Sequence, residues 1–191
     1  MNISDYIKIV NTFEAMKRNT RHSWLSDGRH ESVAEHSWRL TLMAYFIKDE
    51  FPGVDIDKVL KMCIFHDIGE AFTGDIPAFL KTSEDEKTEE NTVEKFLMTL
   101  PEEYRNELIP LFDEMNKLET TEARIYKALD KMETLIQHNE ADISTWLPLE
   151  YEMNLVYGEN EVQFSEYMKE LKKAVNEETI RKIEEKKLSA D

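Results

Sequence analysis

A compact all-helical fold is what this sequence predicts, and three observations support the prediction. Glycine and proline are scarce, with five of each in 191 residues, whereas the helix-favouring residues Glu, Lys, Leu and Met are abundant. Apolar residues make up 41% of the chain, which is enough for a buried core although 34% is charged. Apolar positions also recur at helical spacing. We therefore expect one domain, residues 1–191, that ends in a charged helix.

The first predicted helix covers about residues 4–17, where apolar positions recur every three or four residues. The next segment, residues 18–30, has no periodicity and many turn-forming residues, so it is predicted to be an ordered loop. Ser32 and Glu35 then fit a capping box, which places the start of a long second helix there. That helix should end before the Pro-Gly pair at residues 52–53.

A third helix is expected to begin at Asp55 and to carry His66 and Asp67 near its C-terminal end. Glu70 shares a face with His66 if this helix continues that far. The Thr-Gly-Asp-Ile-Pro segment at residues 73–77 should break it, and a loop continues to Lys81. Further helices are predicted at about residues 84–100, 103–117 (interrupted near Pro110), 122–139 and 160–187, with a less regular stretch at residues 143–158.

The composition excludes several classes of partner. A net charge of −16 argues against general binding to nucleic-acid polymers or anionic membranes, because both bind basic surfaces. No apolar run approaches the ~20 residues of a membrane-spanning helix, and the N-terminus lacks a signal-peptide pattern. The single cysteine, Cys63, excludes a disulfide framework and is expected to be a small buried hydrophobe. These features predict a cytoplasmic protein and remain compatible with a small anionic substrate.

The segment around His66 and Asp67 is the strongest sign of a functional site. An apolar run leads directly into this pair, and burying a His-Asp pair costs free energy unless a partner compensates it. A core histidine hydrogen-bonded to its neighbour is the alternative for an isolated pair. His36 and Asp130 on two other predicted helices favour a metal, because two imidazoles and two carboxylates suit a divalent ion. We therefore expect His36, His66, Asp67 and Asp130 to bind one divalent metal ion (Mn, Co, Fe, Ni, Zn or Mg).

Such a site has the components needed to hydrolyse a phosphoester. The metal would polarise a phosphoryl oxygen and lower the pKa of a water molecule towards neutrality. Glu70, four residues after His66, would orient that water or transfer a proton to the leaving group. Arg21 and Lys81 would bind phosphate oxygens. An ordinary solvated loop is the alternative interpretation for the segment that contains Arg21.

Four motifs occur in order between residues 21 and 130: Glu31-Ser-Val-Ala-Glu-His36-Ser, His66-Asp67-x-x-Glu70, Thr73-Gly74-Asp75-Ile-Pro77 and Leu129-Asp130. This ordered set resembles the HD-domain metal-dependent phosphohydrolases, and most closely their 5′-nucleotidase (5′-deoxynucleotidase) branch. The resemblance implies an all-helical fold and the same four metal ligands. It also implies that Glu70 is the catalytic carboxylate and that Asp75 lies near the sugar or the attacking water.

The chain departs from this branch at one point. The arginine that the resemblance implies falls on Arg21, which the branch follows directly, or nearly so, with tryptophan. Here His22 is the adjacent residue and Trp24 lies two residues further on. His22 is therefore a phosphate contact, a sugar contact or a loop residue, and the preference for ribose or deoxyribose stays open. No histidine lies between Asp67 and Asp130, where dinuclear members usually have extra ones, which favours a single ion.

The resemblance predicts hydrolysis of (deoxy)ribonucleoside 5′-monophosphates to nucleoside and phosphate. The alternatives are a phosphohydrolase that acts on another phosphoester (a nucleoside triphosphate, an alarmone or a cyclic nucleotide) and a nucleotide-binding protein without catalysis. A small-molecule nucleotide is thus the expected ligand. A homodimer is also expected, because the last helices carry more apolar surface than a tail needs and because such dimers are usual in the family.

Several further residues are expected to have structural roles. Glu133, one turn after Asp130, either supports a metal ligand or forms a structural ion pair. His138 is expected on the surface. Large apolar side chains at helical spacing are expected in the core, namely Trp38, Phe46, Met62, Met132 and Met153.

Overall fold

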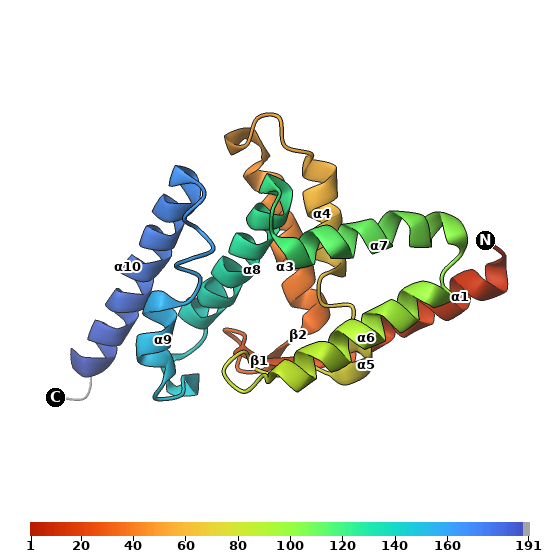
Figure 1. The fold of residues 1–191 in the computed structure, drawn as a ribbon. Helices are drawn as coiled ribbons and strands as arrows, with labels where there is room; N and C mark the ends of the chain where they lie inside the picture. Colours follow the sequence, from red (N-terminus) through yellow and green to blue (C-terminus); the bar gives the residue numbers. More distant parts are fainter. Residues whose placement is uncertain (189–191) are drawn as a thin grey trace.

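The computed structural model describes residues 1–188 and consists mostly of helices, as the sequence predicts (Figure 1). Two short strands form the sheet of this part of the chain. Within residues 1–188, no helix combines the length and the apolar character needed to cross a bilayer. The elements in chain order are α1 (Ile3–Thr12), α2 (Glu14–Arg18), β1 (Thr20–Trp24), β2 (His30–Ser32), α3 (Val33–Phe46), η1 (Lys48–Glu50), α4 (Ile56–Phe65), α5 (Glu70–Thr73), α6 (Ser83–Thr99), α7 (Glu102–Lys117), α8 (Thr121–Glu140), η2 (Ile143–Thr145), α9 (Glu150–Val156) and α10 (Glu166–Leu188).

Helix α8 lies at the centre of the molecule, where α3, α4 and α10 pack against it (Figure 1). Its apolar stripe is buried as predicted, and Ile125, Leu129 and Met132 have no exposed surface. Burial of such a stripe is what stabilises an amphipathic helix against its neighbours. Because Asp130 follows Leu129 directly, it lies within reach of side chains on α3 and α4.

Two helices begin where their capping residues predict. Ser32 caps α3: its hydroxyl accepts a hydrogen bond from the Glu35 N–H, and the Glu35 carboxylate accepts one from the Ser32 N–H. Asp55 caps α4 by accepting a hydrogen bond from the Lys58 N–H at 3.1 Å. Each bond satisfies backbone donors that the first turn of a helix leaves free. These local bonds fix the starts of the two helices that carry His36 and His66.

Helix α4 ends at Phe65 and does not continue to Glu70. His66 and Glu70 therefore do not share a face of one continuous helix. Glu70 instead begins the short helix α5, which ends at Gly74 with a positive φ of 77°. Gly69 allows α6 to approach closely, because a Cβ at that position would lie 2.7 Å from Cγ of Glu89 on α6. The tight approach of α5 to α6 therefore positions Glu70.

The predicted loop at residues 18–30 is wrong in part, because β1 and β2 form an antiparallel hairpin there. Gly28, with a φ of 86°, supplies the left-handed conformation of the turn. The rings of Trp24 and His30 stack across the strands with their centroids 3.9 Å apart. Strand β1 packs against α8, so Arg21 and His22 are held on a regular element beside the site.

Other parts of the structure also differ from the sequence predictions. The first predicted helix is divided at Phe13 into α1 and α2, and the last helix begins at residue 166. Pro110 lies inside α7 without ending it, although a proline removes one backbone donor and crowds the carbonyl of the preceding turn. Met62 and Met132 are buried as predicted, whereas Trp38 and Phe46 are 64% and 79% exposed. Both exposed side chains lie on α3 and project away from the core.

Candidate metal centre and active site

The structure brings together the four side chains that the sequence predicts as metal ligands. His36 comes from α3 and Asp130 from α8, while His66 and Asp67 directly follow α4. Atoms that share one ion at about 2.0–2.2 Å lie roughly 3.0–3.6 Å from one another. Three of the measured separations fall in that range: 3.2 Å from His36 Nε2 to His66 Nε2, 3.3 Å from His36 Nε2 to Asp130 Oδ1, and 3.0 Å from His66 Nε2 to Asp67 Oδ2. The distances from His36 Nε2 to Asp67 Oδ2 and from His66 Nε2 to Asp130 Oδ1 are slightly longer, at 3.8 Å each.

Hydrogen bonds at the outer nitrogen of each imidazole orient the two rings. His66 Nδ1 donates to the Cys63 carbonyl at 2.9 Å, and His36 Nδ1 donates to the carboxylate of Glu133. A neutral imidazole that donates from Nδ1 has a free lone pair on Nε2. Both Nε2 atoms lie beside the carboxylates of Asp67 and Asp130, and once a ring is neutral its Nε2 lone pair is available to a cation there.

The electrostatics of the centre also favour a positive charge. Burial and Arg21 lower the pKa of His36, but Glu133 and Asp130 outweigh them and raise this pKa to about 9. Burial favours the protonated form of Asp67, yet His66 holds its pKa below the ordinary range. Burial also favours the protonated form of Asp130, but Lys127 and Lys131 hold its pKa below the ordinary range. Both carboxylates that the sequence predicts as ligands thus stay ionised, a state that would attract a divalent ion.

Glu133 supports His36 from the side away from the centre. It has no exposed surface, and Arg39 Nε donates to its Oε1 at 2.6 Å. Burial favours its protonated form, but His36 lowers the pKa of Glu133 to about 2. Glu31 lies in the same buried group, and its Oε2 is 3.3 Å from Arg21 Nε. The two arginines supply the positive charge there, so the structure combines the two roles considered for Glu133, an ion pair and support of a ligand.

Arg21 is only 11% exposed and is already paired within the site. Its Nη1 atom is 3.6 Å from Asp67 Oδ2, and its Nη2 atom donates to Thr134 Oγ1 at 3.0 Å. These contacts connect β1 to the segment after α4 and to α8. Burial disfavours the charge, but Glu133 and Asp67 raise the pKa of Arg21 above its ordinary value. This guanidinium therefore holds a ligand carboxylate in place and adds fixed positive charge beside the centre.

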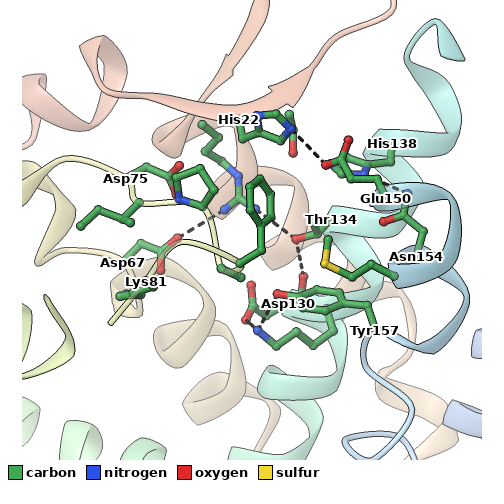
Figure 2. Close-up of a pocket in the computed structure, with 18 of the residues that line it drawn as sticks. His22, Asp67, Asp75, Lys81, Asp130, Thr134, His138, Glu150, Asn154 and Tyr157 are labelled. Carbon is green, nitrogen blue, oxygen red and sulfur yellow. Dashed lines mark hydrogen bonds and ion pairs between the residues drawn. The ribbon is translucent and has the colours of Figure 1, made fainter. Parts of the chain in front are cut away.

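A pocket of about 380 Å³ opens beside Asp67 and Asp130 (Figure 2). Arg21, His22, Glu70, Asp75 and Lys81 also line it. Of the sequence-predicted site residues, His36 and His66 are absent from its lining, and His66 lines a second pocket. Lys81 forms an ion pair with Glu89 of α6. The second pocket, of about 670 Å³, meets the first at Asp67, Lys81 and Lys127.

Glu70 has the environment of a protonated carboxyl group. Its Oε2 atom is buried and has no hydrogen-bond partner among the described residues. Burial, followed by the charges of Asp67 and Asp75, raises the pKa of Glu70 to about 10. Burial also raises the pKa of Asp75, which accepts a hydrogen bond from the His22 backbone. In the absence of a cation, these surroundings therefore favour the protonated form of Glu70.

Sequence reasoning missed several residues of the site. The Nζ atoms of Lys127 and Lys131 lie 3.1 and 3.6 Å from Asp130 Oδ2. The i,i+3 spacing of Lys127 to Asp130 was the signal that could have revealed this lysine, whereas Lys131, next to Asp130 in the chain, had no such signal. The surface prediction for His138 is wrong, because this side chain is buried and lines the pocket. His138 is eight residues after Asp130, on the same face of α8. Glu150 also lines the pocket, but it comes from a stretch without periodicity and had no such signal.

The fold and the site together define a class of protein: a helical chain in which His and Asp side chains from separate helical segments form a candidate metal centre at the end of a pocket. The chain belongs to the HD domain family, whose family model matches residues 13–172. This match confirms the family resemblance and the all-helical fold class that the sequence predicts.

Several proteins similar to this chain are 5′-deoxynucleotidases. The chain is 33% identical over 129 residues to 5′-deoxynucleotidase HDDC2 of Homo sapiens, and this match covers 65% of the chain and 62% of the human protein. It is 32% identical over 148 residues to the Dictyostelium discoideum protein of the same name, covering 72% of the chain and 78% of that relative. The match to the Danio rerio protein is 28% identical and covers 95% of the chain and 90% of the relative.

Two solved structures share the fold closely. One, described as a predicted metal-dependent phosphohydrolase from Magnetospirillum magnetotacticum, has a TM-score of 0.79 at 26% identity and matches 94% of this chain and 93% of its own. The other, a conserved hypothetical protein from Pyrococcus furiosus, has a TM-score of 0.68 at 31% identity and matches 90% of this chain and 99% of its own. Both likenesses extend over nearly the whole chain.

Proposed function

We propose that this protein is a metal-dependent phosphomonoester hydrolase that converts (deoxy)ribonucleoside 5′-monophosphates to nucleoside and phosphate. The observation that carries the proposal is the convergence of two imidazole nitrogens and two carboxylates beside a pocket. Membership of the HD domain family and similarity to 5′-deoxynucleotidases at about 30% identity support the same reaction class.

His36, His66, Asp67 and Asp130 would hold one divalent ion, whose identity this donor set leaves open among Mn, Co, Fe, Ni, Zn and Mg. When bound, the ion would polarise a phosphoryl oxygen and activate water for attack on phosphorus. The close placement of the two Nε2 atoms and the ionised state of both carboxylates support this role.

Glu70 would act as the general acid. As the bond between phosphorus and the 5′-oxygen breaks, the Glu70 carboxyl would give its proton to that oxygen, which leaves as a neutral hydroxyl group. Its raised pKa and its unpaired Oε2 atom support this assignment. Lys127 and Lys131 would attract the phosphate, while Arg21 would orient Asp67. Asp75 and Lys81 would contact the substrate, since both line the pocket.

A larger phosphoester is the second candidate substrate. The second pocket meets the first at Asp67 and has a larger volume, about 670 Å³. The two pockets together leave room beside the same centre for a ligand larger than a nucleoside monophosphate. Nucleoside triphosphates, alarmones and cyclic nucleotides therefore belong in any substrate test.

A phosphate-release assay tests the proposed function. The protein is stripped with a chelator, reloaded with each divalent metal in turn, and given ribo- and deoxyribonucleoside 5′-monophosphates and the larger phosphoesters. We expect phosphate from the monophosphates only after metal is restored, and none from His66→Ala or Asp67→Ala. Turnover confined to the larger phosphoesters, or undiminished by metal removal, would overturn the proposal.

We also propose a cytoplasmic homodimer that has neither nucleic-acid polymers nor membranes as partners. Trp38, Tyr45 and Phe46 expose apolar surface on one side of α3, and this surface suits a second copy better than the last helices do. Cys63 is a buried free thiol, as expected in a reducing compartment, and the net charge of −16 opposes anionic partners. Light scattering of the wild type and of Phe46→Lys would test the dimer: we expect two chains and one chain respectively, and a monomeric wild type would contradict it.

A further inference from the structure

At the end of the pocket away from the metal centre, we infer that Glu150 determines specificity for the nucleoside by accepting a hydrogen bond from one of its donor groups. That donor is a sugar hydroxyl or an exocyclic amine of the base. The inference rests on the proposed function, because it concerns the part of a nucleotide that lies away from the reacting phosphate.

Glu150 is a buried carboxylate, and one of its two oxygens accepts no hydrogen bond. The side chain is 1% exposed, and its Oε2 atom accepts a hydrogen bond from the Leu147 N–H at 2.6 Å. Its Oε1 atom is buried without a hydrogen bond, although His22 Nε2 lies only 3.0 Å away. Leaving such an acceptor unpaired costs free energy, and a ligand that donates to it would recover that cost.

Two histidines hold this carboxylate in place and limit which ligands fit. Asn154 Nδ2 donates to His138 Nδ1 at 3.1 Å, so the proton of a neutral His138 is on Nε2, the atom 3.8 Å from Glu150 Oε1. Burial lowers the pKa of His138, which favours that neutral form. His22 and His138 thus flank the open acceptor with ring nitrogens. A ligand hydroxyl or amine matches Glu150, whereas a phosphate would meet a negative charge there.

The length of the pocket suits a nucleotide with its phosphate at the metal centre. Asp130, Thr134 and His138 recur every four residues on one face of α8, so His138 lies roughly 12 Å along the helix from Asp130. That span is comparable with a nucleoside 5′-monophosphate measured from phosphorus to the far edge of its base. Figure 2 shows Asp130 at one end of this row and the group of His22, His138, Glu150 and Asn154 at the other.

The same geometry favours one of the roles left open for His22. Its Nε2 atom lies 3.0 Å from Glu150 Oε1, and its ring lies edge-on to Phe79, with ring centroids 5.4 Å apart. Phe79 also lines the pocket. His22 is therefore held in the wall around the nucleoside, where it orients Glu150, and a contact with the phosphate is disfavoured.

Glu150→Gln tests the inference, because it keeps the shape of the side chain and removes the negative acceptor. Glu152→Gln on the exposed side of α9 is the matched control. We expect KM for nucleoside monophosphates to rise about 10- to 100-fold in Glu150→Gln, with kcat unchanged. Hydrolysis of p-nitrophenyl phosphate, which has no nucleoside, should be the same in both variants and in the wild type.

Paired substrates identify the donor group. If a base amine is the donor, Glu150→Gln loses the preference of the wild type for AMP over IMP and for CMP over UMP. If a sugar hydroxyl is the donor, the variant instead loses a preference for ribo- over deoxyribonucleotides. Calorimetric titration with the free nucleosides adenosine and cytidine measures the same contact without turnover, and we expect weaker binding to Glu150→Gln.

Two outcomes would overturn the inference. Equal losses on nucleotides and on p-nitrophenyl phosphate would indicate a structural role for Glu150, and unchanged nucleoside binding would remove it from recognition. Thermal unfolding of each variant checks that it is folded. If Glu150→Gln does not fold, Glu150→Asp replaces it in the same assays, because the shorter side chain withdraws the acceptor from the ligand but keeps its charge. Failure of the proposed function is distinct, since it appears in the wild type as absent nucleotide turnover.

Discussion

Glu133 on α8 hydrogen-bonds Nδ1 of His36 on α3, while Nε2 of the same ring faces the candidate metal centre. A fully buried carboxylate thus fixes the orientation and the tautomer of an imidazole whose other nitrogen is available to a metal. Arg39 holds Glu133 in turn. The relationship connects the core of α8 directly to the chemistry of the site.

Glu133→Gln should weaken metal binding by about 10- to 100-fold, because the His36 ring loses its charged partner. Activity should return at high metal concentration, since the four ligands remain. Glu140→Gln is the control, as Glu140 also pairs with Arg39 but lies on the exposed side. A metal titration of phosphate release measures the effect, and equal affinities in the two variants would remove Glu133 from this role.

Glu70→Gln should lower kcat by about 10²- to 10⁴-fold and leave metal binding intact, because only the proton donor is removed. A general acid must be protonated, so wild-type kcat should fall as pH rises through the pKa of Glu70. Burial raises that pKa above the ordinary carboxyl range, which places this loss on the alkaline side. The pH profile of kcat should lack that decline in Glu70→Gln, and an identical decline in both proteins would assign the proton to another group.

Lys172 makes stability depend on pH in a defined window. Burial lowers its pKa from 10.5 to about 8, so between these values the unfolded chain binds more protons than the folded one. The free energy of unfolding should therefore rise with pH from about 8 to about 10.5, relative to Lys172→Met. Urea unfolding of both proteins at several pH values measures this difference. Parallel curves for the two proteins would contradict it.

Local signals explain which parts of the fold were predictable from the sequence. The Ser32–Glu35 capping box and the Asp55 cap involve residues only three apart, so they determine helix starts without knowledge of the rest of the chain. The hairpin of β1 and β2 depends on pairing between strands and on packing against α8, which periodicity does not reveal. Trp38 shows the same limit: helical spacing indicates an apolar face, but not whether a neighbour covers it.

The residues of the candidate site also differ in whether a local sequence signal could reveal them. His66 and Asp67 stand out because an apolar run precedes a polar pair, and the ordered motifs point to His36 and Asp130. Glu150 had no such signal, because only the packing of α9 against the pocket brings it near His22. The residues that would contact the nucleoside thus depend on tertiary structure more than those of the metal centre.

Metal content tests the central claim most directly. After loading and extensive dialysis, elemental analysis of the wild type should find about one equivalent of a divalent ion per chain, while Asp130→Asn, which weakens one of the four ligands, should retain far less. Calorimetric titration of the stripped proteins gives the same comparison as affinities. A wild type that binds no divalent ion, or an Asp130→Asn variant that binds it equally well, would contradict the account.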